Sequence, residues 1–347
     1  MADLTPMMQQ YMATKEQYKD CILFYRLGDF YEMFFDDALV ASKELEITLT
    51  GKNCGQEERA PMCGIPYHAA DSYLTKLVNK GYKVAICEQV EDPKLAKGIV
   101  KREVIRIVTP GTNLNMMSLE ESRNNYLMCI AYTEDKIGIA VVDALTGDFY
   151  VTEVSDTKKL NDEIVKFSPS EIICNDNFLV SGYSIDDLRE RLGISINKID
   201  AWHFEEDSCQ KLLCKHFKVN TLTALGVDDF MAGQIAAGAV LAYLYETQKN
   251  SLSNITHLNP YIASKYMLLD SATRRNLELT ETLREKQKKG SLLWVLDKTK
   301  TAMGARLLRT YLEQPLIEQA DIVLRQEAVG DLLAHPMSRE ELREYLS

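Results

Sequence analysis

The chain contains 347 residues, of which 46% are apolar and 26% are charged, and its formal net charge is −11. A chain of this length accommodates roughly two or three domains with cores of their own. The acidic balance argues against wholesale wrapping of nucleic acid, which needs clustered cations, but it does not exclude a local binding site.

The sequence predicts a cytoplasmic protein with reduced cysteines. No apolar run approaches the length of a membrane span, and the N-terminus lacks the basic and apolar blocks of a signal peptide. The eight cysteines are scattered among apolar neighbours without a Cys-x-x-Cys pair. We therefore expect buried thiols and no zinc site.

The first 112 residues predict a small mixed α/β domain. Thr5-Pro6 is typical of a helix start, with threonine as the cap and proline as the first helical residue. The further elements that we expect here are a strand over 21–25, a helix from about residue 31, a loop over 51–66, a helix over 69–79, and strands over 83–90 and near 100–108.

Residues 113–250 predict a second α/β domain with a mixed sheet. The polar stretch 109–125 is typical of a linker. We expect strands over 126–132, 136–143, 147–154 and 171–174, and helices over 159–167, 185–191 and 230–245. A meander followed by alternating helix and strand favours this fold class.

From about residue 251 the pattern becomes helical. Apolar side chains share one helix face in each of two segments, namely Leu307, Leu308, Tyr311 and Leu312 in the first, and Leu324, Ala328, Val329, Leu332 and Leu333 in the second. Ser338 and Glu341 predict a capping box for a further helix. Because the sequence stops shortly after this expected helix start, we expect a truncated helical domain.

Phe30 and Glu32 are the candidate functional residues. They lie two positions apart after the apolar run 21–25, and the Gly28-Asp29 turn would let both side chains point the same way. An aromatic wedge with an acceptor beside it is suited to opening a base stack. Considered alone, the pattern favours a core position for Phe30 and an exposed position at a helix start for Glu32.

Collinear segments along the whole chain resemble the N-terminal part of the MutS family of bacterial DNA mismatch-recognition proteins. They are Thr5 to Tyr11 (TPMMQQY), Leu23 to Glu32 (LFYRLGDFYE), Gly64 to His68 (GIPYH), Val84 to Gln89 (VAICEQ), Arg106 to Thr112 (RIVTPGT) and Ala272 to Glu278 (ATRRNLE). The resemblance implies an α/β multidomain chain. Its parts would be a mismatch-binding domain (1–112), an RNase H-like connector (113–250) and the beginning of an all-α core domain (251–347).

The resemblance also implies a role for each candidate. Phe30 would enter the minor groove and stack against a mispaired or unpaired base, Glu32 would hydrogen-bond that base, and mismatch repair would begin. A mismatched step is easier to unstack than a matched one, so one aromatic can detect many mismatches. Residues expected to contact the DNA backbone or neighbouring bases are Leu27, Lys52, Lys97, Lys101, Arg102 and Arg106.

The chain lacks the phosphate-binding loop of an ATPase. No Gly-x4-Gly-Lys-[Ser/Thr] motif occurs, so we expect no enzyme activity and no cofactor in these residues. ATP and Mg²⁺ are implied for full-length family members alone. The resemblance implies double-stranded DNA as the ligand, the repair protein MutL as a partner, and a homodimer in the full-length form.

Two rival functions follow from the second domain. RNase H-like nucleases hold metal ions with carboxylates, and Asp143, Asp148 and Glu153 are the acids available for such a site. Asp143 and Asp148, however, flank a turn, where acids are common for backbone reasons. Alternatively, the acidic region 125–245 would serve as a protein-interaction surface.

Overall fold

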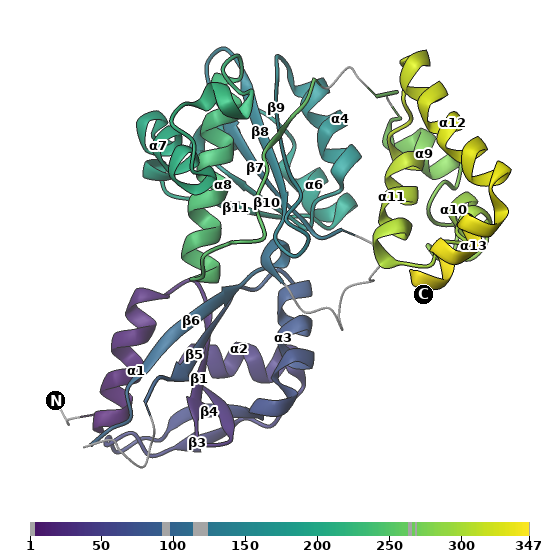
Figure 1. Ribbon diagram of the computed structural model, residues 1–347. Helices are drawn as coiled ribbons and strands as arrows, with labels where there is room; N and C mark the ends of the chain where they lie inside the picture. Colours follow the sequence, from purple (N-terminus) through teal and green to yellow (C-terminus); the bar gives the residue numbers. More distant parts are fainter. Residues whose placement is uncertain (1–3, 92–97, 114–123, 263–265, 268, 347) are drawn as a thin grey trace. The chain divides into compact units, whose positions relative to one another are not determined.

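The structure is a computed structural model that describes residues 4–91, 98–113, 124–262, 266–267 and 269–346. It contains two compact units, one formed by residues 1–118 with 241–254 and the other by 119–240 with 255–347. Each unit is built on a six-stranded mixed sheet (Figure 1). The predicted boundaries at 112/113 and 250/251 stay predictions.

The first sheet has the strand order β3-β4-β2-β1-β5-β6. Strands β1 and β5 are parallel, and the other neighbours are antiparallel. Its elements are α1 (Pro6–Gln17), β1 (Ile22–Leu27), β2 (Phe30–Phe34), α2 (Phe35–Leu45), β3 (Thr50–Lys52), β4 (Ala60–Pro66), α3 (Ala70–Asn79), β5 (Val84–Gln89) and β6 (Arg102–Val108), with short 3-10 turns at Tyr67–Ala69 and Pro110–Thr112.

Two predictions for this unit are wrong. The helix expected from about Tyr31 begins at Phe35, because residues 30–34 form strand β2 between β1 and β4. The expected loop over 51–66 contains β4 and most of β3, which pair with each other. Both errors involve β4, which pairs with β2 and with β3, and the pairing of β2 with β4 joins residues far apart in the sequence. Residues 114–123 of the expected linker lie outside the described residues.

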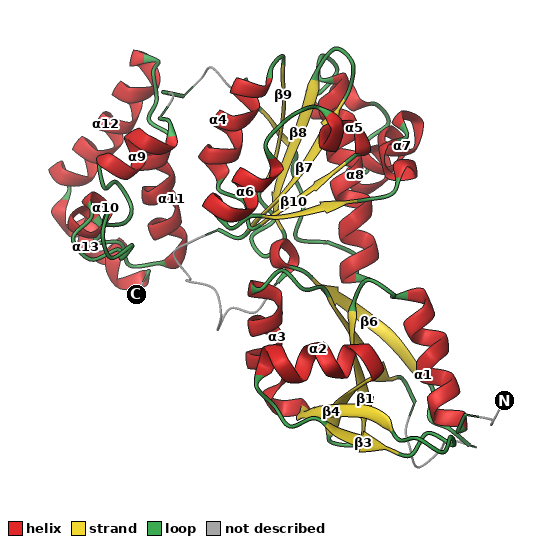
Figure 2. Cartoon of the chain, turned by 180° about the vertical axis from the view of Figure 1, so that it is seen from behind, coloured by secondary structure: helices red, strands yellow, loops and turns green. Residues whose placement is uncertain are grey.

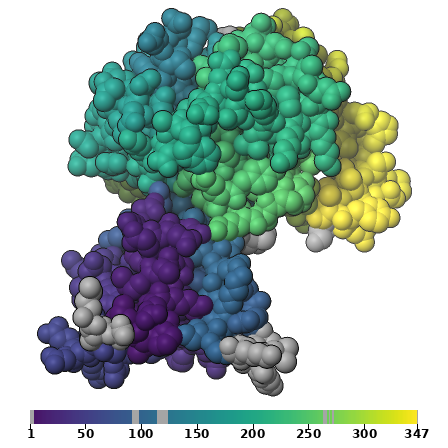
Figure 3. Space-filling model, turned by 90° about the vertical axis from the view of Figure 1, so that its left-hand side faces the viewer, coloured from purple at the N-terminus to yellow at the C-terminus, as the bar shows by residue number. Residues whose placement is uncertain are grey.

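Helices cover both faces of the first sheet (Figures 1 and 2). Helix α1 packs with Leu23, Tyr25 and Phe34 on one face. On the other face α2 and α3 pack with Phe24, Tyr31 and Met33. Figure 3 shows the N-terminal segment in dark purple as a continuous band on the surface of this unit. Alternate residues of β1 and β2 therefore belong to different cores.

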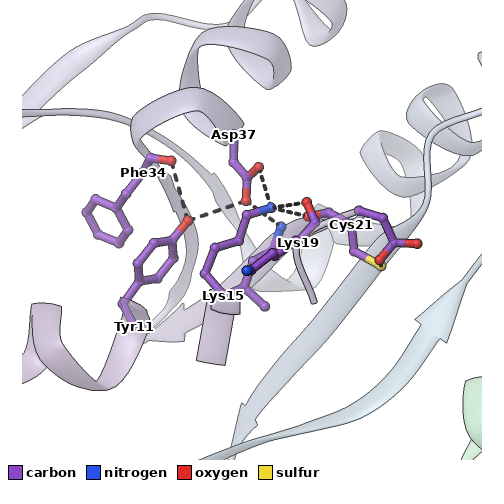
Figure 4. Close-up of polar contacts among 8 residues, drawn as sticks. Tyr11, Lys15, Lys19, Cys21, Phe34 and Asp37 are labelled. Carbon is purple, nitrogen blue, oxygen red and sulfur yellow. Dashed lines mark hydrogen bonds and ion pairs between the residues drawn. The ribbon is translucent and has the colours of Figure 1, made fainter. Parts of the chain in front are cut away.

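A buried carboxylate joins α2 to β1 and α1 (Figure 4). Asp37 accepts hydrogen bonds from the Leu23 backbone N–H at 2.9 Å, from Lys15 Nζ at 2.9 Å and from the Tyr11 hydroxyl at 3.4 Å. Burial and the nearby Asp37 charge raise the pKa of Tyr11, which therefore stays a neutral donor. Lys15 also donates to the carbonyls of Cys21 and Lys19. The cluster fixes the start of β1, the strand that leads to the candidate site.

The second sheet has the strand order β11-β10-β7-β8-β9-β12. Its strands are β7 (Tyr126–Tyr132), β8 (Ile137–Asp143), β9 (Phe149–Val154), β10 (Glu171–Cys174), β11 (Ser195–Lys198) and β12 (Asn259–Pro260), and its helices are α4 (Thr157–Phe167), α5 (Asp176–Val180), α6 (Ile185–Leu192), α7 (Glu206–Phe217) and α8 (Met231–Gln248). The predicted strands and helices over 126–191 are present with shifts of a few residues at their ends. Helix α8 packs closely against β8, because a Cβ on Gly138 would lie 1.9 Å from the Ala232 carbonyl oxygen.

The rest of the chain is helical, as predicted, with α9 (Ser271–Asn276), α10 (Leu292–Leu296), α11 (Ala302–Glu313), α12 (Gln319–Ala334) and α13 (Pro336–Tyr345). The predicted capping box is wrong, because α13 begins at Pro336 and its cap is His335, so Ser338 lies inside the helix. The predicted apolar residues of α12, such as Leu324 and Leu333, are exposed. In the described part of the chain, no helix is long and apolar enough to cross a membrane.

Candidate nucleic-acid interface

The β1–β2 hairpin presents the candidate residues. Its two-residue turn is Gly28-Asp29, with Leu27 paired to Phe30 across it. Gly28 has φ +60°, a backbone conformation that glycine adopts without steric cost and that suits the first central position of a tight hairpin turn. The short turn places Phe30 at the very start of β2, at the end of the sheet.

Phe30 and Glu32 lie on the same face of β2, and Tyr31 lies on the other. This follows from the alternation of side chains along a strand. Phe30 is 48% exposed, whereas Tyr31 is 7% exposed and Phe34, further along the Phe30 face, is 1% exposed. The strand thus carries an anchored aromatic at one end and an accessible aromatic at the other.

Glu32 forms an ion pair with Lys52 of β3. Lys52 Nζ lies 2.5 Å from Glu32 Oε2 and 5.6 Å from the centroid of the Phe34 ring. Gly64 of β4 is the cross-strand neighbour of Glu32, and a Cβ there would lie 3.5 Å from Glu32 Cγ. Gly64 thus leaves space beside Glu32 on the β4 side, and Lys52 reaches the carboxylate from that side of the sheet.

A second cluster holds the opposite face of the hairpin. The Tyr31 hydroxyl donates to Glu88, and Arg26 Nη1 lies 3.3 Å from the same carboxylate. Burial and the Glu88 carboxylate raise the pKa of Tyr31, so this hydroxyl remains a donor. The Arg26 guanidinium also stacks 3.8 Å from the Tyr67 ring centroid, and the Tyr67 N–H donates to the Asp29 carbonyl at 3.0 Å. These contacts anchor the turn from the face that Phe30 does not use.

Arg102 lies on the Phe30 side but bonds within the protein. It donates to the Arg26 carbonyl at 2.7 Å, to Gln10 Oε1 at 3.0 Å and to the Val100 carbonyl at 2.8 Å. Gln10 in turn accepts from the Tyr25 hydroxyl at 2.6 Å. Arg102 thus ties α1 and β1 to β6, a structural role that sequence reasoning missed because its partners lie far away in the sequence.

The other basic candidates are dispersed. Lys101 is exposed and pairs with Glu103 at 2.5 Å. Arg106 lies on the opposite face of the sheet, near Asp71 and Tyr31, and burial lowers the pKa of its guanidinium. Lys97 lies outside the described residues. Lys52 is therefore the basic candidate that the structure brings into contact with Glu32.

Comparison with known protein families matches three consecutive stretches of the chain. Residues 5–116 match MutS domain I, residues 125–256 match MutS domain II, and residues 272–347 match MutS domain III. The chain belongs to the MutS family. The predicted resemblance and the predicted multidomain α/β fold class are thereby confirmed, and Phe30 and Glu32 lie in MutS domain I.

Curated MutS proteins resemble the chain along its whole length. It is 66% identical to the DNA mismatch repair protein MutS of Lachnoclostridium phytofermentans, 55% identical to that of Ruminiclostridium cellulolyticum and 56% identical to that of Acetivibrio thermocellus. It spans 37% of the first relative and 40% of each of the other two. The chain holds MutS domains I to III, and the ATPase domain of the family lies outside it.

Two of the three candidate acids of the MutS domain II region, Asp143 and Asp148, lie close together at a turn, whereas Glu153 lies apart from them. Asp143 accepts hydrogen bonds from the backbone N–H groups of Leu145 and Thr146 at 2.9 and 3.2 Å, and Asn124 donates to both Asp143 and Asp148. Glu153 pairs with Gly138, at the far end of β8 from Asp143, so roughly 17 Å separates the two backbones. Among the described residues, no cluster of histidine, cysteine or acidic side chains could hold a metal ion. The geometry therefore supports the turn-stabilising interpretation over the nuclease one.

Proposed function

We propose that this chain recognises mismatched or unpaired bases in double-stranded DNA by inserting Phe30, with Glu32 hydrogen-bonding the displaced base. The observation that carries the proposal is the shared face of β2, on which an aromatic that is 48% exposed stands beside a carboxylate. Membership of the MutS family, whose relatives are named as DNA mismatch repair proteins, supports it.

The physical basis of recognition is deformability. Inserting a ring unstacks a base step at a cost of a few kcal/mol, which new contacts to the bent duplex repay. A mismatch has already lost part of its pairing and stacking, so the cost is lower there. Contacts among Arg26, Tyr31 and Glu88 support the hairpin. This support suits a wedge, because ordering a mobile hairpin on insertion would cost conformational entropy and weaken binding.

Glu32 adds selectivity in this proposal. A carboxylate that approaches phosphates is repelled, which penalises binding to matched DNA. At a mismatch the hydrogen bond to the base offsets that penalty. Lys101, and Arg102 where its remaining donors allow, would contact phosphates, whereas Leu27 would touch bases beside the wedge.

The wider partners of the family are part of the proposal as well. Initiation of mismatch repair, binding of MutL, homodimerisation and an ATP-driven response would belong to the whole MutS protein in the bacterial cytosol. The chain spans 37% of the first of its curated relatives and 40% of the second.

The test compares binding to a duplex with a G·T mismatch or a single-base bulge against the matched duplex, at stated salt. We expect weak binding with a small mismatch preference, which Phe30→Ala abolishes. Trp202→Ala is the matched control, because Trp202 is an aromatic with 49% exposure outside MutS domain I. A robust mismatch preference that survives Phe30→Ala would contradict the proposal.

A further inference from the structure

The ion pair between Lys52 and Glu32 joins the edge strand β3 to a candidate functional residue. Lys52 is the last residue of β3, and its ammonium lies 2.5 Å from the Glu32 carboxylate. The Lys52 side chain is 32% exposed and the Glu32 side chain is 16% exposed, so water screens the attraction between the two charges incompletely. Within the described residues, Lys52 is the cation that pairs with this carboxylate.

The pair reaches across an intervening strand. The sheet order is β3-β4-β2, so the Lys52 side chain must pass over β4 to meet Glu32. It does so at the Phe34 ring, with Nζ 5.6 Å from the ring centroid, where the ammonium gains a cation–π contact. The contact helps to hold the ammonium beside the carboxylate, and at Gly64 an added Cβ would lie 3.5 Å from Glu32 Cγ.

We propose that Lys52 is a positioning residue that holds the Glu32 carboxylate in the ion pair as the free protein approaches a duplex, and so sets how strongly the site rejects matched DNA. The inference rests on the proposed function of Glu32. A carboxylate released from the pair is free to extend toward the phosphates and is repelled more strongly by them, whereas the ion pair keeps it beside the Lys52 ammonium. Lys52 thereby tempers the penalty that Glu32 imposes on matched DNA.

This role differs from a direct contact between Lys52 and a phosphate. A phosphate contact would weaken binding by the same factor whether or not Glu32 carries a charge. A positioning role makes the effect of Lys52 depend on the Glu32 carboxylate, because Lys52→Met then releases a charged group only where that carboxylate is present. A double-mutant cycle separates the two, because it measures the interaction between the two side chains.

The experiment measures the affinity of the 347-residue chain for a matched duplex at low salt, by fluorescence anisotropy. We expect Lys52→Met to weaken binding about fivefold in the parent and by less than about twofold when combined with Glu32→Gln. Lys52→Arg, which keeps the charge, should restore binding to near the parent value. Lys80→Met is the matched control, because Lys80 forms an ion pair with Glu44 at 2.8 Å and removing it changes the net charge equally.

A loss of equal size in both backgrounds, or no loss in the parent, would overturn the proposal. A second measurement needs no DNA: carbodiimide labelling of Glu32, read by mass spectrometry, should increase in Lys52→Met and not in Lys80→Met. Unchanged labelling would also count against the proposal. Because the cycle uses matched DNA, its outcome is independent of the mismatch preference that Phe30→Ala tests.

Discussion

The Asp37 carboxylate in the first turn of α2 accepts a hydrogen bond from the backbone N–H of Leu23 in β1 at 2.9 Å. Because Asp37 is 7% exposed, this bond and the ion pair with Lys15 are formed away from bulk water. Asp37 thus joins α2, the helix that follows the β1–β2 hairpin, to β1, the first strand of that hairpin.

We expect Asp37→Ala to destabilise this unit by about 3 kcal/mol, because it leaves a buried N–H and the Lys15 ammonium without their acceptor. Pulse proteolysis in urea measures the change. Asp36→Ala is the control, since Asp36 is an exposed acid in the same helical turn and should cost a few tenths of a kcal/mol. Equal losses in the two variants would refute the role of Asp37.

Gly28 offers a test of the hairpin itself. With φ at +60°, Gly28→Ala should cost about 1 kcal/mol, because a side chain strains this backbone conformation. Amide hydrogen exchange of peptides covering residues 22–34 reports the loss locally. Gly330→Ala is the control, since Gly330 lies within α12 with nothing within 4 Å of an added Cβ, and there alanine should be neutral or stabilising.

Glu32→Gln should increase affinity for matched DNA and reduce mismatch preference, because the amide keeps the shape of the side chain but removes the repulsion of phosphates. We expect a gain of about fivefold for the matched duplex at low salt, which shrinks as salt rises. Competition between matched and G·T duplexes measures the preference. An affinity for matched DNA no higher than that of the parent would refute the repulsion.

Cysteine labelling tests the burial of the thiols. Burial raises the pKa of Cys21, Cys63 and Cys87 to about 12, so at pH 8 about one molecule in ten thousand carries each thiolate. All seven cysteines other than Cys214 are buried, whereas Cys214 is half-buried. Iodoacetamide at pH 8 should therefore modify Cys214 first and the others only after denaturation, as followed by mass spectrometry.

Cys214→Ser is the control for that experiment, and it should leave the native chain nearly unlabelled. Fast native modification of Cys87 would contradict the burial. Raising the pH from 8 to 9 increases the thiolate fraction of these buried thiols about tenfold, yet only to about one molecule in a thousand, so we expect most of them to stay unlabelled in the native chain.

Strands with strong local signals were predictable. Segments 126–132 and 136–143 are apolar runs joined by a turn, and they form β7 and β8. Strand β2 was not, because Phe34, Phe35, Ala38 and Ala41 repeat at helical spacing, and the true helix start falls within that pattern. Strand β4 contains Pro61, Gly64 and Pro66, residues that disfavour strands, and its position between β2 and β3 comes from long-range pairing.

The candidate site was predictable in part for the same reason. The Phe30 and Glu32 spacing is local, so the sequence displays it directly. The partner of Glu32 is not local: Lys52 lies 20 residues away and across a strand that the sequence did not predict. Arg102 was expected at phosphates, yet its bonds to Gln10 and Arg26 depend on a sheet that joins residues far apart.

The turn Gly28-Asp29 makes the spacing of the hairpin as important as its composition. Because neighbours on β2 face opposite cores, removing or adding a single residue here would turn Tyr31 outward and direct the charge of Glu32 toward the apolar layer beneath α2. A change of two residues would restore the alternation. We therefore expect this hairpin to tolerate many substitutions but not the insertion or deletion of a single residue. Its length should be constrained more strongly than its composition.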